Sequence, residues 1–272
     1  MFSAFLLISS ALFALGAAVG SFLNVLIYRS IREESWVTGR SKCDHCGRKI
    51  AWYDNIPVLS YLVLRGQSRC CSKPIPLSYP VVEFITGILF VWWYWGGSLF
   101  FHLTTEPLQI LQPLFWLLVG ILLLLIFFAD LLYMIIPDLA VGVLLIITVL
   151  YRVYLATSGV MQLNDLLLAM MGVVIAVSLL GGLWLVTKGK GMGLGDIKYA
   201  VPMALLLGWP RILVGLFLAF ILGGIVAMGL IIAGRKKFGQ IVPFGPFLVV
   251  ATAIALIWGE FLYTWYIGLL MG

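Results

Sequence analysis

The chain has 272 residues, of which 63% are hydrophobic and only 10% are charged, and its mean hydropathy is +1.12. A soluble globular domain is about one quarter charged, so this composition excludes an ordinary soluble protein and indicates a polytopic membrane protein. The formal net charge is +6, but in a membrane protein the positions of Lys and Arg are more informative than their sum. The charge does not indicate nucleic-acid binding.

The apolar runs predict an all-α fold of about eight transmembrane helices, each of roughly 20 residues. The runs cover residues 2–28, 81–96, 112–129, 138–156, 165–187, 197–209, 211–233 and 244–269. The first run has no basic residue ahead of it and is longer than the apolar core of a signal peptide, so we expect a retained span. The sixth run is short and contains Pro202, which predicts a broken or tilted helix packed inside protein.

The basic residues predict the orientation of these spans. With the N-terminus outside, the inner loops are residues 29–80, 130–137, 188–198 and 234–243. They contain 15 of the 17 Lys and Arg residues, and the exceptions are Arg152 and Arg211. This is the bias of the positive-inside rule, and it places the C-terminus outside. The chain then divides into a first helix (1–28), a cytoplasmic loop (29–80) and a membrane-embedded core (81–272).

The cytoplasmic loop contains all four cysteines of the chain. Structural disulfides are rare in the cytoplasm, so a metal site is the favoured interpretation. Cys43 and Cys46 form the C-x2-C half of a tetrahedral zinc site. The other half is irregular, because Cys70 and Cys71 are adjacent, and His45 is a possible substitute ligand. The alternative is four free thiols or a labile pair.

Two acidic residues lie at the cytoplasmic ends of predicted spans. Asp130 ends the third run, and Asp196 lies in the stretch Gly191–Lys198, just before the sixth run. Ionisable residues at such positions are costly and indicate a functional site. A pair of carboxylates that share one proton can act as general base and general acid in peptide hydrolysis. The alternative is that both are helix-end groups, with Asp196 as an N-cap.

Other residues near these motifs have two possible roles each. Asp138 follows a proline and is either a helix cap or a group that supports the catalytic pair. Lys198 either pairs with Asp196 or extends to lipid phosphate. Glu83 either binds a cation or faces the membrane interface. The small and polar residues of the first run, Gly20 to Asn24, serve either helix packing or a substrate groove.

Taken together, these motifs resemble the type IV prepilin peptidases, which are membrane-embedded aspartic peptidases of the GxGD class. Seven stretches carry the resemblance in the family's order: GSFLNVLIYR (20–29), CDHCG (43–47), DNIPVLSYLVLRG (54–66), YPVVE (79–83), ADLLYMIIPD (129–138), GMGLGDIK (191–198) and VPFGPFL (242–248). The resemblance covers nearly the whole chain. It implies a bacterial inner-membrane enzyme whose active site and cysteine loop face the cytoplasm.

The resemblance also implies the activity. Asp130 and Asp196 would be the catalytic aspartates, and the substrates would be prepilins and pseudopilins, cleaved after a glycine. The loop would bind Zn²⁺ and support N-methylation of the new N-terminus by S-adenosylmethionine. Gly193 and Gly195 would let a mobile loop bring Asp196 to Asp130 and let the substrate backbone pass.

The chain departs from the family pattern at two places. Leu132 and Tyr133 replace an acidic residue and a histidine after the first aspartate. Ser68 stands where the family has its third cysteine, and Cys70 appears instead. The second departure bears on zinc binding and on methyl transfer.

Three alternative functions stay open from the sequence. The first is a peptidase without methyltransferase activity. The second is a proton-coupled transporter, for which charges near the middle of the membrane are expected. The third is a scaffold that only docks pilus components.

Overall fold

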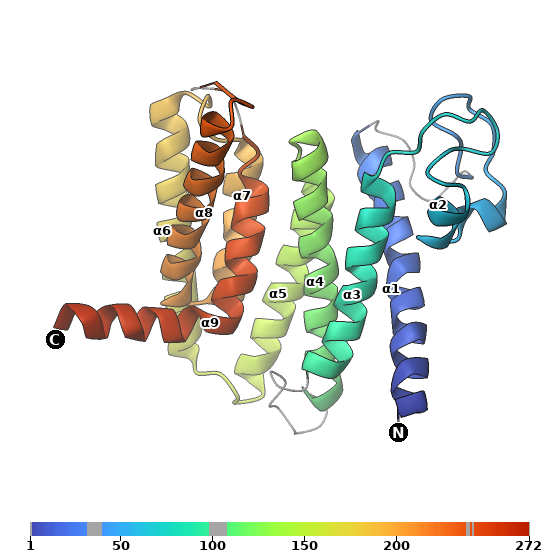
Figure 1. The fold of residues 1–272 in the computed structure, drawn as a ribbon. Coiled ribbons are helices and arrows are strands. Elements are labelled where there is room, and N and C mark those ends of the chain that lie inside the picture. Colours follow the sequence, from blue (N-terminus) through green and yellow to red (C-terminus); the bar gives the residue numbers. More distant parts are fainter. Residues whose placement is uncertain (1, 32–39, 98–107, 238–239, 241, 272) are drawn as a thin grey trace. The chain divides into compact units, whose positions relative to one another are not determined.

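The structure is a computed structural model that describes residues 2–31, 40–97, 108–237, 240 and 242–271. Residues 32–39 of the predicted cytoplasmic loop therefore lie outside the described residues. The helices are α1 (Phe2–Ile31), the 3-10 turn η1 (Trp52–Asn55), α2 (Leu59–Val63), α3 (Ser78–Gly96), α4 (Leu108–Tyr133), α5 (Asp138–Thr157), α6 (Leu163–Thr187), α7 (Leu194–Leu207), α8 (Arg211–Ile232) and α9 (Gly245–Met271) (Figure 1). The predicted all-α class is confirmed. The chain forms two compact units, Met1–Ile121 and Leu122–Gly272, which are described separately below as unit 1 and unit 2.

Each of the eight predicted runs corresponds to one long helix. Within the described residues, six are long and apolar enough to cross a membrane, namely α1, α4, α5, α6, α8 and α9. Helix α7 has only 14 residues, which at 1.5 Å per residue is about 21 Å, less than the roughly 30 Å of a hydrocarbon core. Of the two predicted alternatives, a broken or a tilted helix, the break at Pro202 is wrong, because α7 continues through it to Leu207. Its C-cap is Gly208, where φ is +69°.

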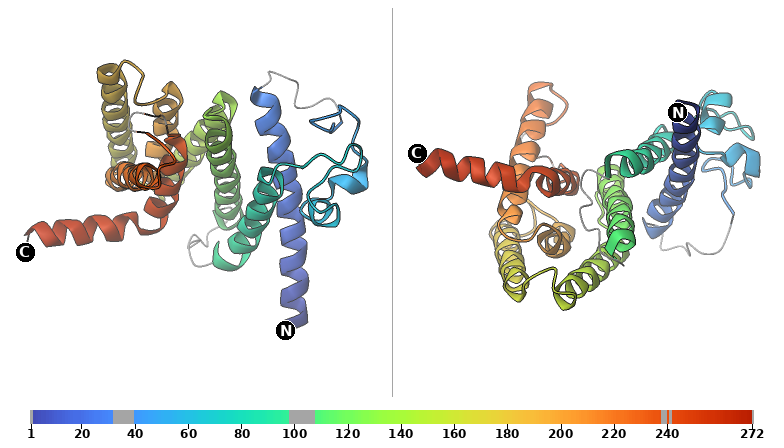
Figure 2. Two further views of the ribbon diagram at one scale, coloured as in Figure 1. Left: turned by 45° about the horizontal axis from the view of Figure 1, so that its top comes forward. Right: turned by 90° about the horizontal axis from the view of Figure 1, so that it is seen from below.

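In unit 1, α1 and α3 pack side by side over much of their length (Figures 1 and 2). Glycines in α1 make this close approach possible. A Cβ added to Gly16 would lie 2.7 Å from the carbonyl oxygen of Thr86, and one added to Gly20 would lie 2.7 Å from the Cα of Glu83. Helix packing is therefore the role of Gly20 that the structure supports.

The described part of the cysteine loop lies beside the end of α1 and the start of α3 (Figure 1). Two short hairpin-like turns form it, and each is closed by one antiparallel bridge. The first bridge joins Lys42 to Lys49 and the second joins Gln67 to Pro74. Each turn contains one pair of cysteines, so two turns of similar form supply the four thiols.

In unit 2, α7 is the central helix and contacts α5, α6, α8 and α9. Most of its residues are buried, which explains how a short helix with an internal proline is accommodated. Tyr199 is completely buried, and its hydroxyl is 2.9 Å from that of Thr252 on α9. The helices alternate in direction, so the end of α4 and the starts of α5, α7 and α9 lie at one end of the unit (Figure 1).

The two basic residues that depart from the predicted charge bias make local contacts in unit 2. Arg152 on α5 donates through Nε to the carbonyl oxygen of Leu205, in the last turn of α7. Arg211, the first residue of α8, pairs with Glu260 on α9. Arg152 thus joins α5 to the end of α7, and Arg211 joins the start of α8 to the middle of α9.

Candidate active site and metal centre

The two carboxylates that the sequence singles out are both buried in unit 2. Asp130 near the end of α4 and Asp196 in the first turn of α7 are each only 6% exposed. A backbone N–H holds each of them: Gly245 donates to Oδ2 of Asp130 at 2.9 Å, and Gly193 donates to Oδ2 of Asp196 at 3.0 Å. Both carboxylates lie at the end of unit 2 where α4 ends and α7 begins (Figure 1).

The alternative that Asp196 is the N-cap of this helix is wrong, although one of its oxygens does accept a hydrogen bond from the N-cap residue. Gly193 is the N-cap of α7 and Asp196 is the third residue of the helix. The Oδ2 atom of Asp196 accepts the Gly193 N–H, while the Asp196 N–H donates back to the Gly193 carbonyl at 3.2 Å. Within the part of the chain that the structure describes, Oδ1 of neither aspartate accepts a hydrogen bond. Each carboxylate therefore keeps one oxygen for a water molecule or a substrate.

The glycines around Asp196 act through their small size. Neither Gly193 nor Gly195 has a positive φ. Gly195 lies inside α7, and a Cβ there would be 3.0 Å from the Cβ of Ile136. The missing side chain lets the segment between α4 and α5 pack against the start of α7, which keeps these two segments together.

The sequence interpretation missed the role of Gly245. It placed Gly245 only within the VPFGPFL stretch, whereas the Gly245 N–H donates directly to Asp130. A Cβ on Gly245 would lie 2.6 Å from Oδ2 of Asp130. The sequence did contain a signal for this role. Gly245 lies between two prolines, at the same predicted membrane depth as Asp130.

Asp138 and Lys198 form an ion pair with each other. The Nζ atom of Lys198 lies 2.7 Å and 3.0 Å from the two carboxylate oxygens of Asp138. Asp138 makes no capping hydrogen bond in α5, and Lys198 does not pair with Asp196 in the structure. The pair links the first turns of α5 and α7 at the surface.

In unit 1, the four cysteines meet as a single cluster. Their four sulfur atoms all lie within 4.8 Å of one another, with Cys43 3.7 Å from Cys71 and Cys46 3.1 Å from Cys70. Zinc–sulfur bonds of about 2.3 Å in a tetrahedron place sulfur atoms slightly less than 4 Å apart. The adjacent cysteines therefore fit a four-thiolate zinc site without further ligands.

Three thiols of this cluster have shifted pKa values, and the shifts differ in direction. Burial acts to raise the pKa of the Cys43 thiol, but the N–H groups of Cys46 and His45 outweigh it and lower this pKa to about 6. The Ser68 hydroxyl and the Lys73 N–H lower the pKa of Cys71, while the hydrogen bond with Cys46 raises that of Cys70 to about 12. A divalent cation would displace the remaining protons, as metal sites of this class do.

Two neighbours lie beside the sulfur cluster and are not part of it. His45 Nε2 lies 3.3 Å from the carbonyl oxygen of Pro74, and His45 is not part of the sulfur cluster, so its substitution for a cysteine is unnecessary. Ser68 Oγ lies 3.0 Å from Cys71 Sγ. Ser68 therefore lies beside one thiol of the cluster, and Cys70 supplies its fourth sulfur.

Glu83 does not face the membrane interface. It is only 9% exposed, in the second turn of α3, and it accepts the N–H of Val58 at 2.8 Å. Nearby, Asn24 on α1 donates from Nδ2 to the carbonyl oxygen of Tyr79 at 3.1 Å. Both Glu83 and Asn24 line a cavity in unit 1.

Comparisons with known proteins match both units of the chain. Residues 14–96 match the bacterial peptidase A24 N-terminal domain, and residues 116–228 match the type IV leader peptidase family. No solved structure matches. Three relatives are each named prepilin leader peptidase/N-methyltransferase. The protein from Aeromonas hydrophila is 32% identical over 95% of this chain and 93% of its own. The protein from Legionella pneumophila is 32% identical over 92% of this chain and 91% of its own. The protein from Pseudomonas putida is 34% identical over 92% of this chain and 90% of its own. The chain therefore belongs to the type IV leader peptidase family.

Proposed function

We propose that this protein removes the leader peptides of prepilins and pseudopilins and then methylates the new N-terminal amine. The observation that carries the peptidase half is the pair of buried carboxylates, Asp130 and Asp196, at one end of unit 2. The relatives' names support both halves. Nothing in the comparisons favours the transporter alternative.

In this proposal, Asp130 and Asp196 act together on the scissile peptide bond. One carboxylate takes a proton from a water molecule, whose oxygen attacks the carbonyl carbon. The other, protonated, donates to the leaving nitrogen, so that a carboxylic acid and an amine result. The fixed oxygen of each group keeps its orientation, while the remaining oxygen faces the reacting atoms.

The membrane location fits a substrate that is itself a membrane helix. Six helices of the described chain suit a membrane, and we place the N-terminus outside and the aspartates at the cytoplasmic face of a bacterial inner membrane. The leader would lie along the cytoplasmic surface, where the basic loops gather. This orientation follows from the distribution of Lys and Arg.

A cleavage assay tests the peptidase proposal directly. The protein purified in detergent is incubated with a full-length prepilin, and the products are identified by intact mass. We expect one cut after the glycine that ends the leader. An intact prepilin, under conditions where an established member of the family cuts it, would contradict the proposal.

The cysteine cluster is the proposed Zn²⁺ site, held by Cys43, Cys46, Cys70 and Cys71. With four thiolates the site is closed, so the metal would stabilise the loop and take no part in peptide hydrolysis. S-adenosylmethionine, when bound, would supply an electrophilic methyl group. The chain would bind this donor and orient the new amine.

Metal analysis gives a separate prediction for the loop. The purified protein is expected to contain about one zinc ion per chain, because four clustered thiols form one tetrahedral site. Cys43→Ser should lose most of this zinc and most methyl transfer while retaining cleavage. The measurement is elemental analysis together with mass spectrometry of the mature pilin N-terminus.

A position swap provides the matched control. The double variant S68C/C70S keeps four thiols and restores the family spacing, and Ser68 already lies beside Cys71, so zinc should be retained. If Cys43→Ser binds as much zinc as the wild type, the assignment of the cluster as a metal site is wrong.

A further inference from the structure

Unit 1 contains a cavity of about 850 Å³ between the cysteine loop and the neighbouring ends of α1 and α3. This volume is within the range of about 300–1,000 Å³ that small-molecule sites occupy. Its walls include tyrosines from three different segments, Tyr28, Tyr53 and Tyr79. Both proposed catalytic aspartates lie in unit 2 and do not line it, so the cavity requires a separate explanation.

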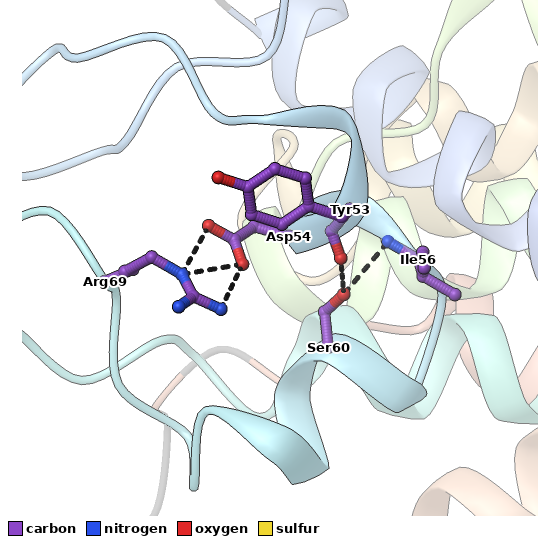
Figure 3. Close-up of polar contacts among 5 residues, drawn as sticks. All are labelled: Tyr53, Asp54, Ile56, Ser60 and Arg69. Atoms are coloured by element: carbon purple, nitrogen blue, oxygen red, sulfur yellow. Dashed lines mark hydrogen bonds and ion pairs between the residues drawn. The ribbon is translucent and has the colours of Figure 1, made fainter.

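Two of the carboxylates that line this cavity have clear partners. Asp54 is paired with Arg69, whose Nε lies 3.0 Å from both carboxylate oxygens and whose Nη2 lies 2.9 Å from Oδ1 (Figure 3). Asp44 accepts the hydroxyl proton of Tyr79 at 3.0 Å. The charge of Asp54 is thus already balanced, and Asp44 is hydrogen-bonded.

The turn that carries Asp54 is itself fixed. Figure 3 shows that the Ser60 hydroxyl donates to the carbonyl oxygen of Tyr53 and accepts the N–H of Ile56, at 2.9 Å and 3.0 Å. The Arg69 guanidinium lies 5.6 Å from the centre of the Tyr53 ring. This wall of the cavity is therefore held in place by contacts within unit 1.

Glu83 is the third carboxylate, and it lacks a cationic partner. It is nine-tenths buried, and among the described residues no Lys or Arg forms an ion pair with it. Its hydrogen-bond partner is a neutral donor, the N–H of Val58. A buried carboxylate without a counter-charge is costly, and a cation bound in the cavity would offset that cost.

The donor that orients Glu83 has an unusual backbone. Val58 has φ +61° and ψ −48°, a conformation that β-branched residues very rarely adopt. Strain of this kind is retained where the surrounding structure enforces it, and it gathers at ligand sites. Here it directs the Val58 N–H at Glu83, which fixes the carboxylate at the cavity wall.

We propose that this cavity binds S-adenosylmethionine and that Glu83 faces the positive charge of this methyl donor. The proposal rests on the methyltransferase half of the proposed function. A carboxylate attracts the sulfonium and ammonium groups of the donor, and tyrosine rings favour both cations and flat aromatic bases. The cavity volume and the buried carboxyl group of Glu83, which forms no ion pair with a described Lys or Arg, are the observations that carry it.

Direct binding of the donor tests this assignment. Full-length protein with its zinc, in detergent, is titrated with S-adenosylmethionine by calorimetry. Glu83→Gln keeps the size of the side chain and removes its charge, so we expect the Kd to rise about 10- to 100-fold. Glu260→Gln, the same change in unit 2, should leave the Kd unchanged. Both variants should cleave prepilin at the wild-type rate.

Further variants and measurements distinguish a failure of this proposal from a failure of the proposed methyltransferase activity. Glu83→Asp, which keeps the charge, should bind the donor more tightly than Glu83→Gln. If Glu83→Gln binds the donor as tightly as the wild type, the proposal is overturned. This holds also if the variant raises only the KM for the acceptor peptide. A parallel loss of zinc and cleavage would mark Glu83 as a structural residue and would also overturn it. A wild-type protein that cleaves prepilin but binds no donor would instead refute the methyltransferase half of the proposed function.

Discussion

Asp130→Asn and Asp196→Asn are each expected to lower kcat for prepilin cleavage by about 10²- to 10⁴-fold, the usual range for loss of a general acid or base. Asparagine has the same shape and can still accept the backbone N–H of Gly245 or Gly193 through its amide oxygen. The helices should therefore assemble normally, while proton transfer is lost. The measurement is the rate of leader release by purified variants, with intact mass to identify the product.

Asp138→Asn is the matched control for these variants. Its carboxylate is also at the start of a helix near the same end of unit 2, but its side chain is 73% exposed and is paired with Lys198. Exposed ion pairs contribute about 1 kcal/mol or less, so cleavage and stability should change little. A loss with Asp138→Asn as large as that with Asp130→Asn would contradict the assignment of the catalytic residues.

Gly245→Ala is expected to reduce cleavage by at least about 100-fold. The added Cβ would lie 2.6 Å from Oδ2 and 3.0 Å from Cγ of Asp130, so the carboxyl group has to move and its hydrogen bond to the Gly245 N–H is disturbed. A displacement of about 1 Å at a catalytic group can cost about 100-fold in rate. The measurement is kcat and KM for the same prepilin, and the fall should lie mainly in kcat.

Gly142→Ala serves as the control for this change. Gly142 lies in α5 of the same unit, and a Cβ there would meet no atom within 4 Å. Its activity and thermal midpoint should equal those of the wild type. Wild-type activity in Gly245→Ala would show that Asp130 does not need the observed contact.

The sequence predicts the helices well because membrane burial imposes a simple requirement. Each span needs a long apolar run, so each of the eight runs locates one helix of the described chain, and the alternating directions bring Asp130 and Asp196 to the same end. Helix α7 is the short one, as its short apolar run predicts. Most of its residues are buried against the other helices of unit 2.

The contacts that orient the site were not predictable in the same way. Gly245 and Asp130 are 115 positions apart, and no local pattern specifies that the N–H of one meets the carboxylate of the other. Glu83 and Val58 are likewise joined only by the fold. The irregular spacing of Cys70 and Cys71 suggested a defective metal site. In the structure, the turn closed by the Gln67–Pro74 bridge brings both sulfur atoms into the cluster.

The central claim is that Asp130 and Asp196 act as one catalytic unit, and a double-mutant cycle tests it most directly. Single-turnover cleavage is measured for the wild type, both single variants and D130N/D196N. If the carboxylates form one proton-transfer unit, the double variant should lose little more than either single variant. A loss in the double variant equal to the product of the two single losses would show independent roles. Wild-type rates in either single variant would contradict the claim outright.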